Sequence, residues 1–600
     1  MSLVSAKEIA KVLNINKFGF FGNAVGWVLL KVLGISKLNK VYDKTKHLDK
    51  LDFLDAMVKE FQIDFEIPEE DLKRIPKTGA FITVSNHPLG GIDGILLLKL
   101  LASSRPDFKI LANFILLKIE PIKDFVLPVN PFDNKKDEGK SSYTGIKQAL
   151  EHVNNGNPLG LFPAGEVSTY SDGMLIQDKP WEEAAVKFIK KARVPVVPIC
   201  FHAKNSTLFY ILAKLSDTLR TAKLPSELLT QKRRTIKVRI GNQIPVKDQD
   251  EYEDLSKFSD FIRMKTYMLA NPYKKGLLKI ITPTLIFPSQ PKTIVTARPT
   301  EHLIEEVEQL KVSDAILLTS KNYSVFLADS QQIPNILHEI GRLREITFRT
   351  IGEGTNKTID IDVYDAYYKH MFLWDNDAQR VVGAYRMGLG DEIYKAKGIE
   401  GFYVNELFKF EPELYSMLSK TIEMGRAFII NEYQQRPMPL FLLWKGIVHV
   451  TLRYPNLKYL LGGVSISNKF SNFSKSLMIG FMKSNYYDPY VAQYVHPKKD
   501  YKVRLKDEHK DYIFDASKVD MNKFDKLIDE IEPGSLRLPV LLKKYVKQNA
   551  RLVAFNVDPK FNNAIDGLMY IRISDLPEST VKPVMEEFQA ALEKKLSDES

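Results

Sequence analysis

Short apolar runs alternate with amphipathic helical patterns along residues 80–246. Short runs rich in β-branched residues are typical of buried strands, whereas apolar positions three and four apart are typical of helices. The runs predict strands at 80–85, 109–112, 160–162, 194–201 and 235–240, with helices at 143–154 and 180–192 between them. Because strands and helices alternate, the first half of the chain is predicted to be an α/β domain.

The second half of the chain also reads as α/β. Its patterns predict strands at 323–328, 381–387, 426–430, 459–464 and 550–555, and helices at 332–345, 412–424 and 440–453. No internal repeat relates the halves, so two unlike domains are expected. A proline-rich stretch at 281–300 marks the boundary. We therefore divide the chain into helices at 1–50, a domain at 51–285, a linker at 286–300, and a second domain with a C-terminal extension at 301–600.

Residues 1–50 have the pattern of basic amphipathic helices. Aromatic and aliphatic residues cluster between Lys17 and Lys37, as in a helix that lies in the headgroup layer of a membrane. A buried helical hairpin fits the same pattern, and both descriptions can hold together. The apolar block 22–35 lacks a small-residue cleavage site and is interrupted by polar residues, so neither a signal peptide nor a membrane-spanning helix is expected.

The net charge of +11 is concentrated in the first half. Residues 1–300 carry 45 Lys and Arg against 32 Asp and Glu, whereas residues 301–600 carry 40 against 42. A basic half predicts an acidic partner, such as an anionic membrane or an acidic carrier protein, unless the lysines only solvate the surface. No nucleic-acid-binding motif is present, so no nucleic-acid partner is expected. The single cysteine, Cys200, predicts a reducing compartment.

One turn between a predicted strand and an apolar segment combines a histidine with a carboxylate. Residues 86–93 read NHPLGGID and follow the predicted strand 80–85. A histidine is the side chain best suited to take a proton near neutral pH, and a carboxylate can hold it in the required tautomer. We therefore predict His87 as a general base that is oriented by Asp93. A structural histidine is the alternative.

Three later stretches of the first half support the prediction that His87 and Asp93 form a catalytic pair. They are FPAGE at 162–166, VPVVP at 194–198 and KILAN at 109–113. With these motifs in this order, residues of about 50–250 resemble the glycerolipid acyltransferase family, which contains the 1-acylglycerol-3-phosphate acyltransferases. The resemblance implies that His87 deprotonates an acceptor hydroxyl, which then attacks an acyl thioester. It assigns substrate binding to Asn86, Phe162, Pro163, Gly165 and Glu166.

Two departures from the family pattern bear on the acceptor. Five residues separate His87 from Asp93, where four are usual, and the Gly90-Gly91 pair can absorb the extra one. The acceptor block has Val167 where the family has arginine. Losing that guanidinium weakens the case for a phosphate-bearing acceptor and favours a zwitterionic or amino-acid headgroup. The His-Pro-Leu-Gly-Gly form resembles the aminolipid, or hemolysin-like, branch of the family. A helix-cap role for Glu166 stays equally open.

A second set of charged residues lies between 323 and 440, where a simple fold would not require them. In chain order they are Arg342, Arg344, Glu345, Arg349, Asp360, Asp362, Asp365, His370, Arg386, Glu423 and Arg426. For any one of them a plain ion pair is the alternative. The three aspartates could form a metal site, but a calcium loop needs a fuller ligand set, so we predict no metal.

The order of these residues resembles the acyl-homoserine lactone synthase and ornithine N-acyltransferase branch of the GNAT (N-acetyltransferase) fold, over about 320–470. The tail segments 538–545 and 558–562 resemble the end of the ornithine-acyltransferase family, with Asn549 where glycine is common. The resemblance implies an amine that attacks a thioester beside a splayed strand. Carboxylates of Asp362 or Glu423 would bind or deprotonate the ammonium. The remaining predicted substrate-binding residues, for the substrate carboxylate or the acyl carrier, are Arg342, Glu345, Arg349, Arg386 and Arg426.

Together the two resemblances predict an α/β chain of two unlike acyltransferase domains, similar to the bifunctional ornithine lipid (aminolipid) synthases. The GNAT-like domain would N-acylate an amino acid, with ornithine favoured, using a 3-hydroxyacyl chain from acyl carrier protein or acyl-CoA. The other domain would O-acylate the 3-hydroxyl of that lyso-aminolipid. A single-activity lysophospholipid acyltransferase with a non-catalytic C-terminal half and a non-enzymatic membrane-binding protein are the alternatives. No cofactor is expected, and the predicted location is peripheral, on the cytoplasmic face of the inner membrane.

Overall fold

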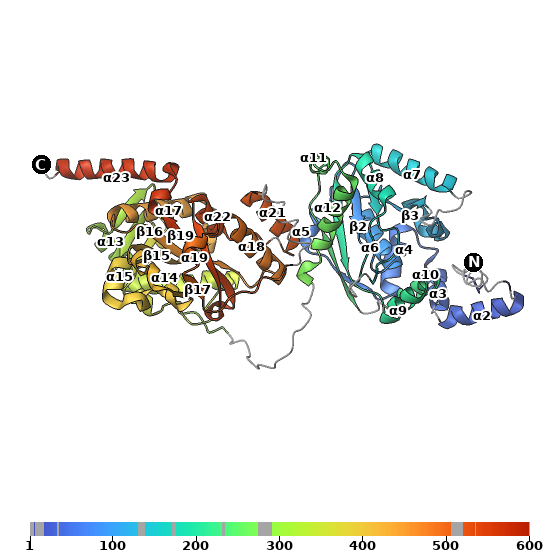
Figure 1. The fold of residues 1–600 in the computed structure, drawn as a ribbon, viewed down its shortest axis with the longest axis horizontal. Helices are drawn as coiled ribbons and strands as arrows, with labels where there is room; N and C mark the ends of the chain where they lie inside the picture. The colour runs from blue at the N-terminus through green and yellow to red at the C-terminus, as the bar shows by residue number, and fades with distance from the viewer. Residues whose placement is uncertain are drawn as a thin grey trace. The chain divides into compact units, whose positions relative to one another are not determined.

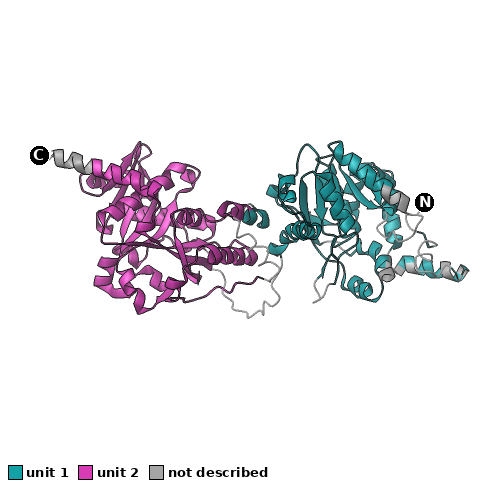
Figure 2. Ribbon diagram, turned by 45° about the horizontal axis from the view of Figure 1, so that its top comes forward, with its two compact units in different colours: residues 1–277, 527–536 teal, residues 278–526, 537–600 magenta. Residues whose placement is uncertain are grey.

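The computed structural model describes residues 5–6, 17, 19–32, 35–129, 139–170, 176–230, 234–273, 291–505, 520–534 and 536–598. The chain divides into two compact units (Figure 2). The first comprises residues 1–277 and 527–536, and the second comprises residues 278–526 and 537–600.

A sheet forms the centre of the first unit (Figure 1). It has seven strands in the order β1-β9-β8-β2-β5-β3-β4. All neighbouring strands are parallel except β8 and β9. The strands are β1 (Asp64–Glu66), β2 (Ile82–Ser85), β3 (Lys109–Asn113), β4 (Val126–Val129), β5 (Leu159–Leu161), β8 (Val196–His202) and β9 (Thr235–Ile240). The main helices are α4 (Lys50–Glu60), α6 (Gly91–Ala102), α7 (Gly139–Asn154), α8 (Glu183–Ala192), α9 (Thr207–Leu215), α10 (Asp217–Glu227) and α12 (Leu255–Met268).

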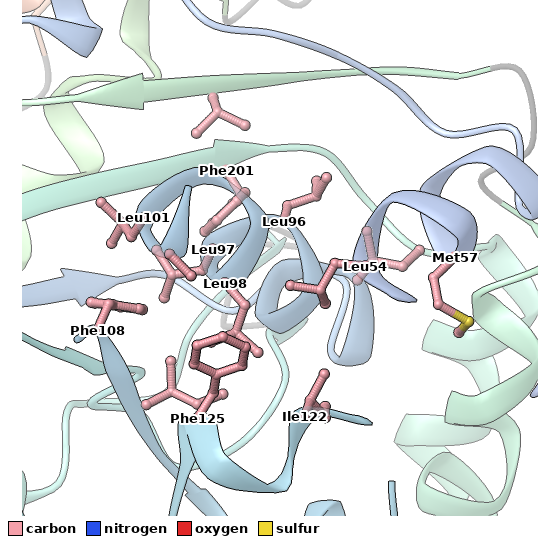
Figure 3. Packing of buried hydrophobic residues seen from close by; sticks show 14 of the residues in the cluster. Leu54, Met57, Leu96, Leu97, Leu98, Leu101, Phe108, Ile122, Phe125 and Phe201 are labelled. Carbon is pink, nitrogen blue, oxygen red and sulfur yellow. The ribbon is translucent and has the colours of Figure 1, made fainter. Parts of the chain in front are cut away.

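Strand β2 and helix α6 are held in the core of this unit. All four residues of β2 are buried, as expected for a parallel strand that is covered on both faces. Helix α6 packs Leu97, Leu98 and Leu101 among Phe108 and Phe125 (Figure 3). Because both elements are fixed by packing, the turn that joins them is held at a defined place at the carboxyl end of the sheet.

The N-terminal region contains helices α2 (Gly19–Val32) and α3 (Ile35–Thr45). Helix α2 exposes Phe21, Val25, Trp27 and Val28. Of the predicted helical region 1–50, residues 1–4, 7–16, 18 and 33–34 lie outside the described residues. Within the described residues, no helix combines the length and the apolar character needed to cross a membrane.

An eight-stranded sheet forms the second unit, in the order β10-β11-β12-β13-β15-β16-β19-β18. Its strands are β10 (Ile316–Ser320), β11 (Tyr323–Ala328), β12 (Lys369–Asp375), β13 (Arg380–Leu389), β15 (Thr421–Ile429), β16 (Tyr459–Ile466), β18 (Arg551–Asp558) and β19 (Ala564–Arg572). The main helices are α13 (Thr300–Lys311), α14 (Pro334–Ile351), α15 (Gly390–Lys397), α17 (Pro437–Arg453), α18 (Asn472–Asn485), α22 (Val540–Lys547) and α23 (Glu578–Asp598). Only β15 and β16 pair in parallel. The predicted α/β fold class with two unlike domains is confirmed.

One predicted helix is wrong. The helix expected at 412–424 ends early, because α16 covers only Tyr415–Leu418 and β15 begins at Thr421. The first four residues of β15 are all buried between two neighbouring strands, and this tertiary environment overrides the local helical pattern. Glu423 therefore lies inside a strand and not at a helix-to-strand junction.

Two segments bear on where the boundary between the two domains lies: the predicted linker and residues 527–536. Of the predicted linker 286–300, residues 286–290 lie outside the described residues, and Lys292 and Val295 donate backbone hydrogen bonds to residues 356 and 358. Residues 527–536, in the predicted C-terminal extension, pack with the first unit. There Arg74 and Arg239 donate to the carbonyl oxygens of residues 529–532 at the end of α21 (Met521–Ile531).

Candidate active sites

The first site lies where β2 passes into α6 through residues 86–90. Gly90 has a φ of +79°, in the region that favours glycine. A β-carbon at Gly90 would also lie 2.9 Å from Cδ1 of Leu224. The turn therefore needs glycine here, and this conformation accommodates the five-residue spacing between His87 and Asp93.

His87 and Asp93 lie side by side in this turn. Nδ1 of His87 is 3.1 Å from Oδ2 of Asp93. The same oxygen accepts the backbone N–H groups of Leu89 at 2.7 Å and Gly90 at 3.0 Å. Complete burial raises the pKa of Asp93, against the lowering effects of His87 and the backbone donors. The His87 side chain remains 19% exposed, so a substrate can reach the imidazole while Asp93 occupies its Nδ1 side.

Polar contacts fix the backbone around His87. Asn86 exchanges two hydrogen bonds with the backbone of Phe201 in β8, at 2.9 and 2.7 Å. The backbone N–H of His87 donates to Oδ1 of Asp178 at 3.2 Å, and its carbonyl accepts from the backbone N–H of Ser168 at 2.9 Å. Asn86 thus fixes the backbone next to His87. Asp178 and Ser168 also fix this backbone, and the sequence analysis missed both.

The predicted acceptor block contacts the histidine through one ring. The Phe162 ring lies against the imidazole of His87, with centroids 4.2 Å apart. Gly165 has a φ of +67° and donates its N–H to the carbonyl of Phe162 at 3.0 Å, which closes a tight turn. The carbonyl of Pro163 accepts from the backbone N–H of Glu182 at 2.9 Å. The block therefore forms one wall of the His87 site.

Glu166 lies between two basic side chains. Its carboxylate is 2.6 Å from Nη2 of Arg220 and 2.5 Å from Nζ of Lys179. Arg220 comes from α10 and is buried. The sequence analysis named neither cation, because nothing in the local pattern of α10 connects it with a turn far earlier in the chain. The acceptor block has Val167 where the family has arginine, but Arg220 of α10 brings a guanidinium group to the neighbouring Glu166.

The second site lies where the parallel strands β15 and β16 separate. The two strands pair only from Thr421 with Tyr459 to Met424 with Gly462. Beyond this point β15 pairs only with β13, and β16 pairs only with β19. The register of β13 against β15 shifts here, and Arg426 adopts a φ of +51°. Beyond Met424 and Gly462 the backbones of β15 and β16 therefore no longer pair with each other.

Glu423 is the buried carboxyl group at this separation. Its Oε2 accepts from the Tyr368 hydroxyl at 2.6 Å, and its Oε1 accepts from the backbone N–H of Val404 at 2.9 Å. Burial raises the pKa of Glu423 to about 7. A carboxyl group with this pKa can take a proton from a substrate ammonium near neutral pH and release it again.

Three arginines and three aspartates form an ion-pair network beside Glu423, in which Arg344 pairs with Asp365 at 2.8 Å. Asp362 bridges two of the guanidinium groups, at 2.5 Å from Arg386 and 3.1 Å from Arg426. Arg386 also lies 3.3 Å from Asp365, and Arg426 lies 3.4 Å from Asp360. Within the described residues, no three His, Cys, Asp or Glu side chains are placed to hold a metal ion. The three aspartates therefore act as ion-pair partners of the arginines.

Aromatic rings that the sequence analysis missed surround these arginines. The Tyr403 ring lies 5.2 Å from the guanidinium of Arg386 and 4.9 Å from that of Arg426. Tyr368, which bonds Glu423, also lies 5.3 Å from Arg386. Rings at these distances stabilise a cation in a dry environment. The structure thus brings Asp362, Arg386, Glu423 and Arg426 together.

The other predicted residues of this domain lie elsewhere, on α14. Arg342 pairs with Glu339 at 2.6 Å. Glu345 is buried and accepts from Arg349 at 2.6 Å and from the Thr355 hydroxyl at 2.6 Å. These pairs fix α14 and the loop that follows it. The predicted role of Arg342, Glu345 and Arg349 in substrate binding stays a prediction.

Comparisons with known proteins match each half of the chain to a family of acyl-transferring enzymes. A family model described as "Acyltransferase" matches residues 10–276, and one described as "Acetyltransferase (GNAT) domain" matches residues 343–444. "Glycine N(alpha)-acyltransferase" of Bacteroides thetaiotaomicron is 28% identical over 277 residues, which cover 44% of this chain and 81% of that protein. "Lyso-glycine lipid O-acyltransferase" of the same organism is 25% identical over 274 residues, 44% of this chain and 97% of that protein.

Among solved structures, the 1-acyl-sn-glycerophosphate acyltransferase PlsC from Thermotoga maritima shares 17% identity with a TM-score of 0.26. It covers 42% of this chain and 98% of its own. The two family models and the curated relatives confirm the prediction of an acyl-transferring enzyme.

Proposed function

We propose that this chain, an acyltransferase with two domains of unlike fold, makes an acyloxyacyl aminolipid in two steps. The observation that carries the proposal is that each unit holds a proton acceptor of its own, with neighbouring groups that orient it. The first unit has His87 beside Asp93, and the second has Glu423 beside separating strands. A single-activity acyltransferase would leave one of these two arrangements without a function. A non-enzymatic membrane-binding protein would leave both without one.

In the first step the second unit N-acylates an amino acid. The amine nitrogen attacks the carbonyl carbon of a 3-hydroxyacyl thioester, the carbon–sulfur bond breaks, and the carrier leaves as a thiol. Glu423 takes the proton that the amine loses. Arg386 and Arg426 supply guanidinium groups for the carboxylate of the amino acid. The product is a one-chain amide with a free 3-hydroxyl.

In the second step the first unit O-acylates that hydroxyl. A hydroxyl is a weak nucleophile until a base takes its proton, and His87 oriented by Asp93 is suited to this task. The oxygen attacks a second thioester, and the thiol leaves again. The headgroup then carries an ammonium, a carboxylate or both, which suits the paired charges of Glu166 and Arg220.

The names of the relatives support this order of steps but leave the amino acid open. One relative is named for glycine N-acylation and the other for O-acylation of a lyso-glycine lipid. The sequence analysis favours ornithine. Either amino acid gives an amide that the second reaction consumes. The donor in both steps is an acyl thioester of acyl carrier protein or coenzyme A.

The experiment that tests the proposal uses the purified full-length chain. It is mixed with ornithine or glycine and 3-hydroxyacyl carrier protein, and an unsubstituted acyl thioester is added afterwards. We expect a one-chain amide first, followed by its conversion to a two-chain lipid. Consumption of a lysophospholipid acceptor with no amide from either amino acid would contradict the bifunctional account and support the single-activity alternative.

The proposal also places the enzyme at the cytoplasmic face of the inner membrane as a peripheral protein. Both products are lipids, and α2 presents Phe21, Val25, Trp27 and Val28 beside Lys31. We expect Trp27→Ser to lower the partition coefficient on phosphatidylglycerol vesicles at least about tenfold, since burying one large apolar side chain contributes about 1.5–3 kcal/mol.

Sedimentation with vesicles measures this partition coefficient. Phe441→Ser is the matched control, because Trp27 and Phe441 are both 54% exposed and Phe441 lies in the second unit. Equal losses for the two variants, or no loss for Trp27→Ser, would contradict a role of α2 in membrane binding.

A further inference from the structure

A buried tyrosine hydroxyl bonds the carboxyl group of the second site. Tyr368 immediately precedes β12 and is 2% exposed. Its hydroxyl donates to Oε2 of Glu423 at 2.6 Å and accepts from the backbone N–H of Tyr403 at 3.0 Å. The carbonyl oxygen of Gly401 lies at a longer distance, 3.4 Å. Because a hydroxyl has one proton to donate, the shorter contact identifies Glu423 as its acceptor.

This bond is one of two that fix the orientation of Glu423. Its Oε2 accepts from Tyr368, and its Oε1 accepts from the backbone N–H of Val404 at 2.9 Å. Glu423 is itself buried in β15. A buried side chain with a separate donor on each oxygen is held in one position by its neighbours. The carboxylate is therefore oriented before a substrate binds.

A glycine on the neighbouring strand leaves the space that the Tyr368 ring occupies. Gly388 of β13 pairs with Glu423. A β-carbon at Gly388 would lie 2.5 Å from Cε1 of Tyr368 and 2.8 Å from Cδ1 of Ile393. The φ of Gly388 is not positive, so contact with these side chains, and not the backbone conformation, excludes a larger residue. The register thus places a glycine opposite Glu423, where any side chain would displace the ring.

The hydrogen bond from Tyr368 also acts on the acidity of Glu423. Burial raises the pKa of Glu423 to about 7, and several neighbouring groups oppose this rise. Tyr368 lowers the pKa most, followed by the charge of Arg386 and the backbone N–H groups of Val404 and Tyr403. The Arg386 guanidinium lies 5.3 Å from the centroid of the Tyr368 ring. Tyr368 thus contacts both the base and the cation of the site.

The charge of Glu423 also acts on two further tyrosines, and both stay neutral near pH 7. Burial raises the pKa of Tyr364 above its usual range and that of Tyr367 to about 12. Their hydroxyls donate to other acceptors. Burial likewise raises the pKa of Tyr368 well above its usual range, so its hydroxyl keeps the proton that it donates. On β16 the residue paired with Glu423 is Leu461, which carries no charge.

We propose that Tyr368 is a positioning residue of N-acyl transfer, whose hydroxyl orients Glu423 and favours the ionised form that takes the proton of the amine. The inference rests on the proposed function, in which Glu423 is the base. A donor that bonds a carboxylate stabilises its charged form more than its neutral form. The proton passes from the amine to Glu423, and Tyr368 keeps its own.

Tyr368→Phe in the purified full-length chain tests this role. We expect the loss of the donor to raise the pKa of Glu423, so that the inflection in kcat/KM for the amino acid moves up by about one to two pH units. The ratio of the wild-type rate to the variant rate should be about 10–100 near pH 6 and should approach one at alkaline pH. The measurement is the rate of amide formation from ornithine or glycine and 3-hydroxyacyl carrier protein across this pH range.

Gly388→Ala is the second variant, and it decides the test by the same criterion if Tyr368→Phe does not fold. Its added methyl group displaces the Tyr368 ring and should move the inflection in the same direction. Tyr433→Phe is the matched control. The buried Tyr433 hydroxyl donates to Oδ2 of the buried Asp375 at 2.9 Å, in the same unit and away from Glu423. This variant should keep the wild-type inflection.

Three results would overturn the inference while the N-acylation proposal stands. They are an inflection that stays near pH 7 in Tyr368→Phe, a rate loss by the same factor at every pH, and an equal shift in Tyr433→Phe. The second result would show that Tyr368 only supports the fold. Absence of any amide from the wild-type chain would overturn the proposed function and the inference with it.

Discussion

Replacing His87 with alanine is expected to lower O-acyl transfer by about 10²–10⁴-fold, the usual contribution of a general base. The imidazole lies 3.1 Å from Asp93 and is the group in this turn that can take a proton from a hydroxyl. N-acyl transfer uses residues of the other unit and should stay within about twofold of wild type. The measurement is the initial rate of two-chain lipid formation from a synthetic 3-hydroxyacyl amide and an acyl thioester.

His152→Ala is the matched control for this variant. His152 lies in α7 of the same unit, with its Nε2 3.2 Å from the carbonyl oxygen of Pro158. It should keep the wild-type rate of O-acylation. If His87→Ala also keeps that rate, or if both variants lose it equally, His87 has no specific role and the account of the first site is wrong.

Replacing Glu423 with glutamine is expected to lower N-acyl transfer by about 10²–10³-fold. Glutamine keeps the size of the side chain and the hydrogen bond from Tyr368, but it cannot accept a proton. O-acyl transfer from a supplied amide should be unaffected. The measurement is the rate of amide formation from an amino acid and a 3-hydroxyacyl thioester.

The pH dependence gives a second readout for Glu423. Burial raises the pKa of this carboxyl to about 7, so its ionised form, which accepts the proton, increases as the pH rises through 7. The wild-type rate should therefore show an inflection near pH 7. The inflection should be missing in Glu423→Gln, where only the titration of the substrate amine remains.

Glu306→Gln controls for the loss of a buried carboxylate as such. Glu306 is buried in α13 of the same unit and accepts from the backbone N–H groups of Asn335 and Ile336. Its replacement should leave the rate and the pH inflection of wild type. An inflection near pH 7 that persists in Glu423→Gln would show that another group titrates, and would remove Glu423 from the base role.

The first site could be predicted largely from sequence because its parts are contiguous. His87 and Asp93 are six residues apart on a strand–turn–helix, so local geometry alone brings them together. Phe162 follows a neighbouring parallel strand, whose carboxyl end meets the same edge of the sheet. Arg220 could not be found in this way, since only tertiary packing brings α10 to Glu166.

The second site was harder to predict because distant strands build it. Glu423 was expected at the end of a helix, but pairing with β13 and β16 makes that segment a strand. Tyr368 and Tyr403 were missed because only tertiary packing brings their rings to Glu423 and to the guanidinium groups of Arg386 and Arg426.

Lipid mass spectrometry of a bacterium without aminolipids, expressing the wild-type chain or the His87→Ala or Glu423→Gln variant, tests the central claim most directly. The account predicts a two-chain aminolipid with the wild type, its one-chain amide with His87→Ala, and neither with Glu423→Gln. The mass of the headgroup would identify the amino acid. No new aminolipid from a well-expressed wild-type chain, or a two-chain aminolipid from both variants, would contradict the account of two cooperating sites.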